Sequence, residues 1–125
     1  MNLNQVTLPV HDMELATAFY RKLGFTQIVD SPHYARFVTA NEASFSLHLQ
    51  DEPIHNSAVI YFEHEALDDW VDELVSKGVV FEQLPTDMPY LWREAILHDP
   101  SDNAIKLYWA GDNRLNPPWR VNTQD

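Results

Sequence analysis

Cysteine is absent from this chain of 125 residues. That absence excludes disulfides, thiol nucleophiles and thiolate metal sites together. The 3 glycines form no Gly-rich phosphate loop. No apolar run approaches the ~18 residues that a membrane helix needs, and the first residues lack the basic and apolar regions of a secretory signal. We therefore expect a cytoplasmic protein with no membrane partner.

Basic residues are also scarce, because 8 Lys and Arg stand against 19 Asp and Glu, for a net charge of −11. A field of that sign repels phosphate backbones, so we expect no nucleic-acid partner. The same field attracts a cationic ligand over long range, although an acidic surface also serves solubility alone. The length fits one domain, and a hydrophobic content of 45% is normal for a globular protein.

The first half of the chain predicts a strand, a helix and three more strands. Alternating apolar residues predict a strand over 5–10, and Asp12 then suits a helix N-cap. An apolar stripe predicts a helix over 13–23, which Gly24 closes in the left-handed conformation. The strands that follow are expected around 27–30, 34–39 and 44–50.

The second half begins with the same pattern. Alternation predicts a strand over 57–63, and an apolar stripe from Leu67 to Val75 predicts a helix that Gly78 ends. The remaining prediction is a strand at 79–81, a loop over 84–90, strands over 91–98 and 104–109, and an extended surface tail from Gly111.

The two halves can be placed in register. Gly24 and Gly78 each close a helix, and they are as far apart as Val6 and Ile60, which lie on the core side of the strands before those helices. We therefore predict an α+β fold in which residues 1–125 form a single domain of two βαβββ modules. The modules span about 1–52 and 55–110, and the tail covers 111–125.

Each predicted helix has one apolar stripe, so the helices cover the apolar face of the sheet. A solvent-facing sheet is one interpretation of the opposite face. Its mixture of hydroxyls, amides and rings, with little charge, favours a ligand cleft instead. The residues expected on this polar face are Gln5, Thr7, Ser46, His48, Gln50, Ser57, Tyr61, Lys106 and Tyr108.

Motifs at both ends carry a family resemblance. The segment QVTLPVHD at 5–12, AFY at 18–20, LGF at 23–25 and DPSDNAIKL at 99–107 resemble the vicinal oxygen chelate superfamily, up to about Ala110. This superfamily includes glyoxalase I, extradiol dioxygenases, fosfomycin-resistance enzymes and bleomycin-binding proteins. The resemblance implies a curved mixed sheet around a cleft, helices on its outer face, and a homodimer. Asp102 stands where the family usually has Gly, and Asp tolerates the left-handed conformation.

The resemblance also implies where a divalent metal would bind. The family positions fall at Gln5, His48 (or Leu47), Ser57 and Lys106, and His48 is the one strong ligand among them. An ammonium at Lys106 offers no acceptor and repels a cation. We therefore predict no metal site and no cofactor.

Two functions remain open. The first is a metal-free protein that binds a small organic ligand, cationic or aromatic, as the bleomycin-binding branch does. The ligand-binding residues would be Gln5, Thr7, His48, Ser57, Tyr61, Trp92, Lys106 and Tyr108, although the face on which Trp92 lies cannot be assigned.

The alternative is a lyase, isomerase or dioxygenase of the same superfamily. It would use one displaced divalent metal, such as Ni, Zn or Fe, or acid-base chemistry. His48 and a Lys106 of low pKa are the candidate catalytic residues.

Overall fold

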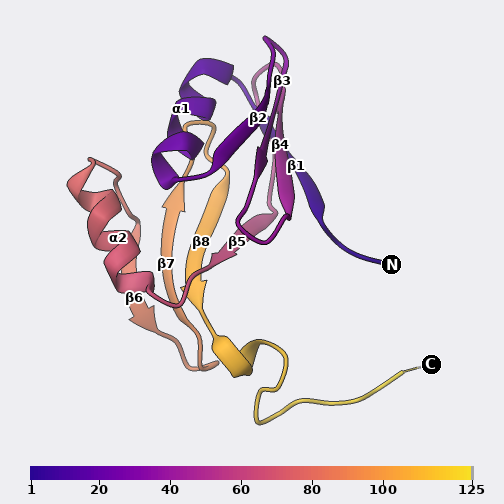
Figure 1. Ribbon diagram of the computed structural model, residues 1–125, viewed down its shortest axis with the longest axis vertical. Coiled ribbons are helices and arrows are strands. Elements are labelled where there is room, and N and C mark those ends of the chain that lie inside the picture. The colour runs from indigo at the N-terminus through magenta and orange to yellow at the C-terminus, as the bar shows by residue number, and fades with distance from the viewer. Residues whose placement is uncertain (125) are drawn as a thin grey trace. The chain divides into compact units, whose positions relative to one another are not determined.

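The computed structural model describes residues 1–124 and contains two βαβββ modules (Figure 1). The first module consists of β1 (Gln5–Val10), α1 (Met13–Leu23), β2 (Thr26–Asp30), β3 (Tyr34–Val38) and β4 (Ser44–Leu49). The second consists of β5 (Val59–Glu63), α2 (Leu67–Ser76), β6 (Gln83–Asp87), β7 (Arg93–His98) and β8 (Ala104–Trp109), followed by a 3-10 turn, η1 (Gly111–Arg114). Within residues 1–124, neither helix has the length and apolar character needed to cross a bilayer.

Each module builds a four-stranded sheet with the same connectivity. The strand order is β1-β4-β3-β2 in one sheet and β5-β8-β7-β6 in the other. In the first sheet β1 runs parallel to β4, while β3 is antiparallel to both of its neighbours. The predicted α+β class and the two repeated modules are therefore confirmed.

The first module packs α1 onto one face of its sheet. Asp12 caps the helix by accepting a hydrogen bond from the Leu15 backbone N–H at 2.9 Å, and Gly24 closes it at a φ of 106°. The buried side of α1 includes Tyr20, whose ring lies 5.1 Å from that of Phe45 and 5.8 Å from that of Phe37. The buried side chains of β3 and β4 therefore form a core with the helix, which covers the apolar face of the sheet as predicted.

The second module repeats this arrangement with α2. Leu67, Val71 and Leu74 are buried on the helix. Ala95, Leu97, Ile105 and Leu107 are buried on β7 and β8. Burying these apolar side chains, at about 25 cal/mol per Å², stabilises the module.

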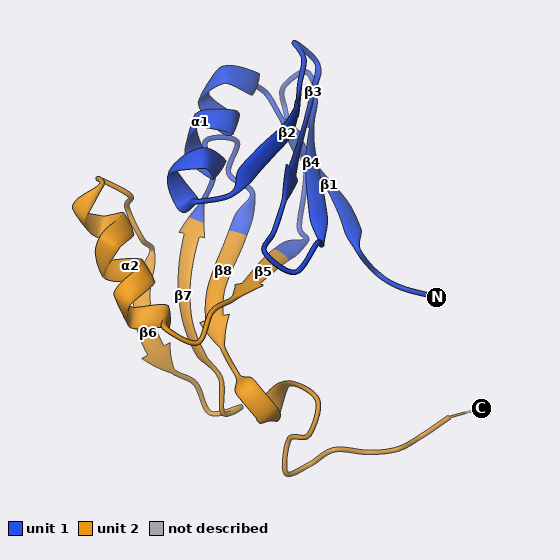
Figure 2. Cartoon of the chain, in the orientation of Figure 1, with its two compact units in different colours: residues 1–59, 98–104 blue, residues 60–97, 105–125 orange. Residues whose placement is uncertain are grey.

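By their internal contacts the residues form two compact units, 1–59 with 98–104, and 60–97 with 105–125 (Figure 2). The turn between β7 and β8 thus belongs to the first unit. There the Tyr20 hydroxyl donates to Oδ2 of Asp99 at 2.7 Å, and Asn103 Nδ2 donates to the Pro9 carbonyl at 2.8 Å. Asp102 in this turn has a φ of 64°, the left-handed conformation for which the family uses Gly.

The predicted strand at 79–81 and loop at 84–90 are wrong. The Val79 N–H donates to the Leu74 carbonyl and closes α2, so this apolar segment ends a helix instead of pairing in the sheet. The strand is β6, which contains Pro85. Because β6 lies at the edge of its sheet, a residue without an N–H is tolerated there.

Two further boundaries differ from the prediction. Ser57 lies before β5, is exposed, and does not belong to that strand. The tail is not extended throughout, since η1 forms directly after β8. Glu63 explains this turn, because its Oε2 accepts hydrogen bonds from the N–H groups of Ala110 and Gly111 at 2.9 and 3.1 Å.

Candidate functional site

The polar face of the first unit is organised around Ser46. This side chain is fully buried, and β1 and β4 pair so that Thr7 lies beside it. The hydroxyls of Thr7 and Ser46 are 3.0 Å apart, and Nε2 of Gln5 also donates to Ser46. Oε1 of Gln5 accepts from the Ser44 hydroxyl. The nitrogen and the oxygen of the Gln5 amide are therefore both hydrogen-bonded to side chains of β4.

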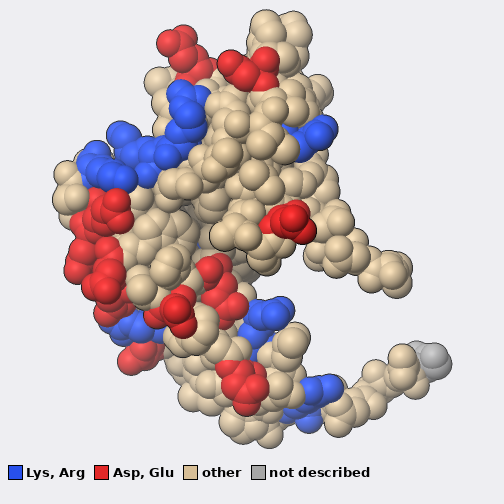
Figure 3. All heavy atoms as spheres, viewed as in Figure 1, with Lys and Arg blue, Asp and Glu red and all other residues tan. Residues whose placement is uncertain are grey.

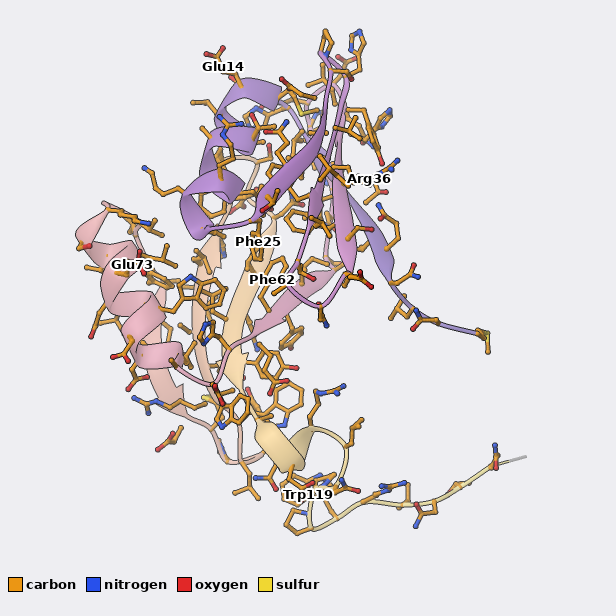
Figure 4. All side chains as sticks on the ribbon, viewed as in Figure 1. Glu14, Phe25, Arg36, Phe62, Glu73 and Trp119 are labelled. Atoms are coloured by element: carbon orange, nitrogen blue, oxygen red, sulfur yellow. The ribbon has the colours of Figure 1, made fainter. Side chains whose placement is uncertain are left out.

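Tyr34 and Arg36 extend this polar face on β3. Arg36 lies on the side away from α1 (Figure 4), opposite Ser46 in the pairing of β3 with β4. Its Nε donates to the Tyr34 hydroxyl at 3.0 Å. Hydrogen bonding by Ser46 and then by Arg36 lowers the pKa of Tyr34. His48 pairs opposite Tyr34 and is exposed.

In the second unit, aromatic rings and an ion pair pack together on the sheet face opposite α2. Four rings form an aromatic cluster here: Tyr61, Tyr90, Trp92 and Tyr108. Trp92 stacks on Tyr108 with ring centroids 4.7 Å apart, and Tyr61 meets both rings edge-on. Tyr61 is 43% exposed and Tyr90 37%, whereas Tyr108 is 6% exposed and is the buried ring on which Trp92 stacks. The cluster thus presents ring surface to solvent on a rigid base.

An ion pair lies beside the cluster. Glu94 on β7 is 1% exposed, and its Oε2 is 2.8 Å from Nζ of Lys106 on β8. The other carboxylate oxygen accepts from the Tyr90 hydroxyl. The hydrogen bond to Glu94 raises the pKa of Lys106 against an opposing effect of burial. Burial, followed by the bond to Glu94, raises the pKa of Tyr90.

The turn after β8 holds the cluster in place. Glu63 accepts from the backbone of this turn and lies 3.6 Å from Nε of Arg114. Trp92 Nε1 donates to the Asn113 carbonyl at 3.5 Å. Burial, and then the nearby charge of Glu63, raises the pKa of Tyr108. Its hydroxyl therefore stays protonated at neutral pH.

The side chains at the implied metal positions do not fit a divalent cation. Lys106 is held as an ammonium by Glu94, and the Gln5 oxygen is engaged by Ser44. Among residues 1–124, no group of three or more His, Asp or Glu side chains is placed to hold a metal ion. In the second unit the chemistry beside the rings is that of the Lys106 ammonium over a buried Glu94 carboxylate.

The structure divides the predicted site residues between the two units. Gln5, Thr7 and His48 lie in the first unit, while Tyr61, Trp92, Lys106 and Tyr108 come together in the second. The lysine of low pKa that an acid-base mechanism would use is not present, because the pKa of Lys106 is raised. The structure also assigns Trp92 to the face of Tyr108, which the sequence left open.

Sequence reasoning missed Glu94 and Tyr90. The signal was the alternation of β7, where Ala95 and Leu97 point to the core and so place Glu94 on the opposite face. A hairpin closed between Asp99 and Asn103 then puts Glu94 on the same face as Lys106.

Comparisons with known proteins agree with this fold. The structure resembles a glyoxalase/bleomycin resistance protein/dioxygenase from Nocardioides, with a TM-score of 0.76 and 21% identity over 98% of this chain and 90% of that one. The structure also resembles a glyoxalase/bleomycin resistance protein/dioxygenase family enzyme from Burkholderia phytofirmans PsJN. The TM-score is 0.72 and the identity 21%, over 88% of this chain and 99% of that one. For lactoylglutathione lyase from Agrobacterium tumefaciens the TM-score is 0.68 and the identity 17%, over 86% of this chain and 92% of that one.

At these identities the solved structures show a shared fold alone. No curated protein matches the chain significantly in sequence. The sequence model of the Glyoxalase/Bleomycin resistance protein/Dioxygenase superfamily matches residues 2–107. That match covers both modules, from before β1 into β8. The chain therefore belongs to the glyoxalase/bleomycin resistance protein/dioxygenase superfamily.

Proposed function

We propose that this protein binds a small planar organic ligand on the aromatic cluster of its second unit, without a metal ion at the family's position. The carrying observation is the pair of exposed rings, Tyr61 and Tyr90, around a Trp92 that stacks on buried Tyr108. Rings held by packing lose little entropy when a ligand stacks on them. A few polar groups beside such a surface orient the ligand.

The test is a binding screen with planar aromatic compounds, read by thermal shift and then by calorimetry. Trp92→Ala removes the central ring, and we expect affinity to fall by about two- to tenfold, since an aromatic contact contributes about 0.5–1.5 kcal/mol beyond its buried area. Trp109→Ala is the matched control, because this tryptophan is 41% exposed and follows Tyr108 on β8, which places it on the opposite face of the sheet. Equal losses in both variants would contradict the proposal.

The proposal of a metal-free site has its own test. Purified protein is incubated with Ni²⁺, Zn²⁺ or Fe²⁺, dialysed and analysed for bound metal. We expect no stoichiometric metal, because Lys106 presents a positive charge where the family places a ligand. One ion per chain that is lost in His48→Ala would instead support the alternative, a metal-dependent lyase, isomerase or dioxygenase.

We also propose that the protein forms a homodimer. What supports this is the segment after η1, where Leu115, Trp119 and Val121 are 56–75% exposed. The Arg120 backbone N–H donates to the Pro117 carbonyl, and its side chain donates to Asn116 and Asn122, so the segment is ordered without packing its apolar side chains. The only charged side chain between positions 115 and 124 is Arg120. An exposed apolar surface with so little charge suits a second copy of the chain, and light scattering on wild type and Trp119→Ala tests the assembly.

A further inference from the structure

In the ion pair beside the aromatic cluster, one partner is buried and the other reaches solvent. Glu94 is 1% exposed, whereas the Lys106 side chain is 22% exposed. The carboxylate therefore lies beneath the ammonium, and the ammonium is the group that an incoming molecule meets. A buried charge needs its partner, so Glu94 holds Lys106 in this position.

Glu94 offers little to a ligand. One of its oxygens accepts from the Tyr90 hydroxyl and the other faces Lys106 Nζ at 2.8 Å. An ammonium has three N–H donors and no acceptor. Nζ also lies 5.5 Å from the centroid of the Tyr61 ring, so its remaining donors are beside an exposed aromatic face. The polar group available there is a donor.

The acidic surface formed by α2 lies elsewhere. Glu63, whose charge acts on Tyr108, accepts from the backbone of Ala110 and Gly111 and lies 3.6 Å from Nε of Arg114. The carboxylates of α2 gather on its outward side (Figure 3), and they include Asp68, Asp69, Asp72 and Glu73. α2 covers the core face of its sheet, whereas the cluster lies on the opposite face. Charges beyond about 8 Å are largely screened at physiological salt. At the cluster, contact with Lys106 therefore decides which charge is preferred.

We infer that the ligand is a planar aromatic compound carrying a carboxylate or carbonyl oxygen, which accepts a hydrogen bond from Lys106 while its ring contacts Tyr61 and Trp92. This inference rests on the proposed function and makes it more specific. It reverses the preference for a cation that the net charge suggests, because a cationic group would face the ammonium.

The experiment uses three probes with one ring system: 2-naphthoate, its methyl ester and 2-naphthylmethylammonium. Their dissociation constants are measured by calorimetry on the full chain. We expect naphthoate to bind about tenfold or more tightly than the ammonium compound, because a charge-assisted hydrogen bond replaces a repulsion. The ester, which keeps the acceptor without the charge, should lie between them.

Two variants separate the contributions. Lys106→Met leaves Glu94 buried without its cation, so the double variant Glu94→Gln/Lys106→Met is the folded comparison. It should bind the three probes with nearly equal affinity, whereas Lys77→Met, which removes a lysine paired with Glu73 on α2, should keep the wild-type order.

The outcomes are distinct. Tighter binding of the ammonium probe, or an order that the double variant leaves unchanged, would overturn the inference while the aromatic site stands. Failure of all three probes to bind wild type would overturn both the inference and the proposed function.

Discussion

The Tyr20 hydroxyl donates a hydrogen bond to Oδ2 of Asp99 at 2.7 Å, although 79 residues separate them in the sequence. Asp99 also accepts from the backbone N–H groups of Ser101 and Asn103 and from the Asn103 side chain. The carboxylate thus organises its own turn and ties it to α1. This hydrogen bond joins the DPSDN motif to the tyrosine of AFY in the folded chain.

Replacing Tyr20 with Phe should lower the free energy of unfolding by about 1.5–3 kcal/mol, the usual range for a bond to a charged group. Tyr20 is fully buried, so no water can replace the lost donor. Urea unfolding measures the change. Tyr61→Phe is the control, since its ring is 43% exposed, and a loss of similar size there would contradict the argument.

Asp102 is a site for stabilisation. It has a φ of 64°, a conformation that costs a residue with a Cβ about 1 kcal/mol or more. We expect Asp102→Gly to raise the melting temperature slightly and Asp102→Val to lower it, because a β-branched residue tolerates this region worst. Calorimetry checks the order. A melting temperature for the Val variant at or above wild type would show that the turn is not strained.

Tyr34 should ionise at a lower pH than a free tyrosine. Hydrogen bonding by Ser46, followed by Arg36, lowers its pKa in the folded state. A lowered pKa means that its contribution to stability is present above the ordinary tyrosine pKa and is lost as pH falls through the folded value. An NMR titration of the Tyr34 ring carbons measures the pKa, and Arg36→Gln should raise it. An identical titration in both proteins would contradict this cause.

Removing Lys106 should lower the free energy of unfolding more than removing Glu94 does. Lys106→Met leaves a carboxylate that is 1% exposed without its cation, at a cost of about 3 kcal/mol or more. Glu94→Gln should cost less, since Lys106 can reach water, and the double variant should recover most of the loss. Urea unfolding at neutral pH measures all three. Equal effects of the single variants would show that Glu94 is not desolvated.

The same pair predicts a pH dependence. The pKa of Lys106 is raised in the folded protein, so its stabilisation is complete below the ordinary lysine pKa. It is lost as pH rises through the folded value. The advantage of wild type over the double variant should therefore shrink in alkali. Unfolding curves from neutral to alkaline pH check this, and a constant difference would contradict the ionic origin.

The sequence by itself determined much of the first module and of β8. The signals used there are local. They are apolar residues that recur every 3.6 residues in helices and every 2 in strands, the N-cap at Asp12 and the left-handed Gly24. The helix α1 has the predicted bounds of Met13–Leu23. The repeat and the two-faced sheets follow from the same local patterns, because alternation places side chains on a face whatever the strand pairs with.

Only the tertiary structure decided the remainder. Val79, Val80 and Phe81 have the composition of a strand, but the backbone of Val79 closes α2 and the edge strand forms later, around Pro85. Likewise, Lys106 looks like an isolated cation in the sequence. Its partner Glu94 is on the neighbouring strand, and the pairing of β7 with β8 brings them together. A local pattern specifies a face, whereas long-range pairing specifies the neighbours on it. The charge that a ligand meets on the polar face therefore depends on those neighbours.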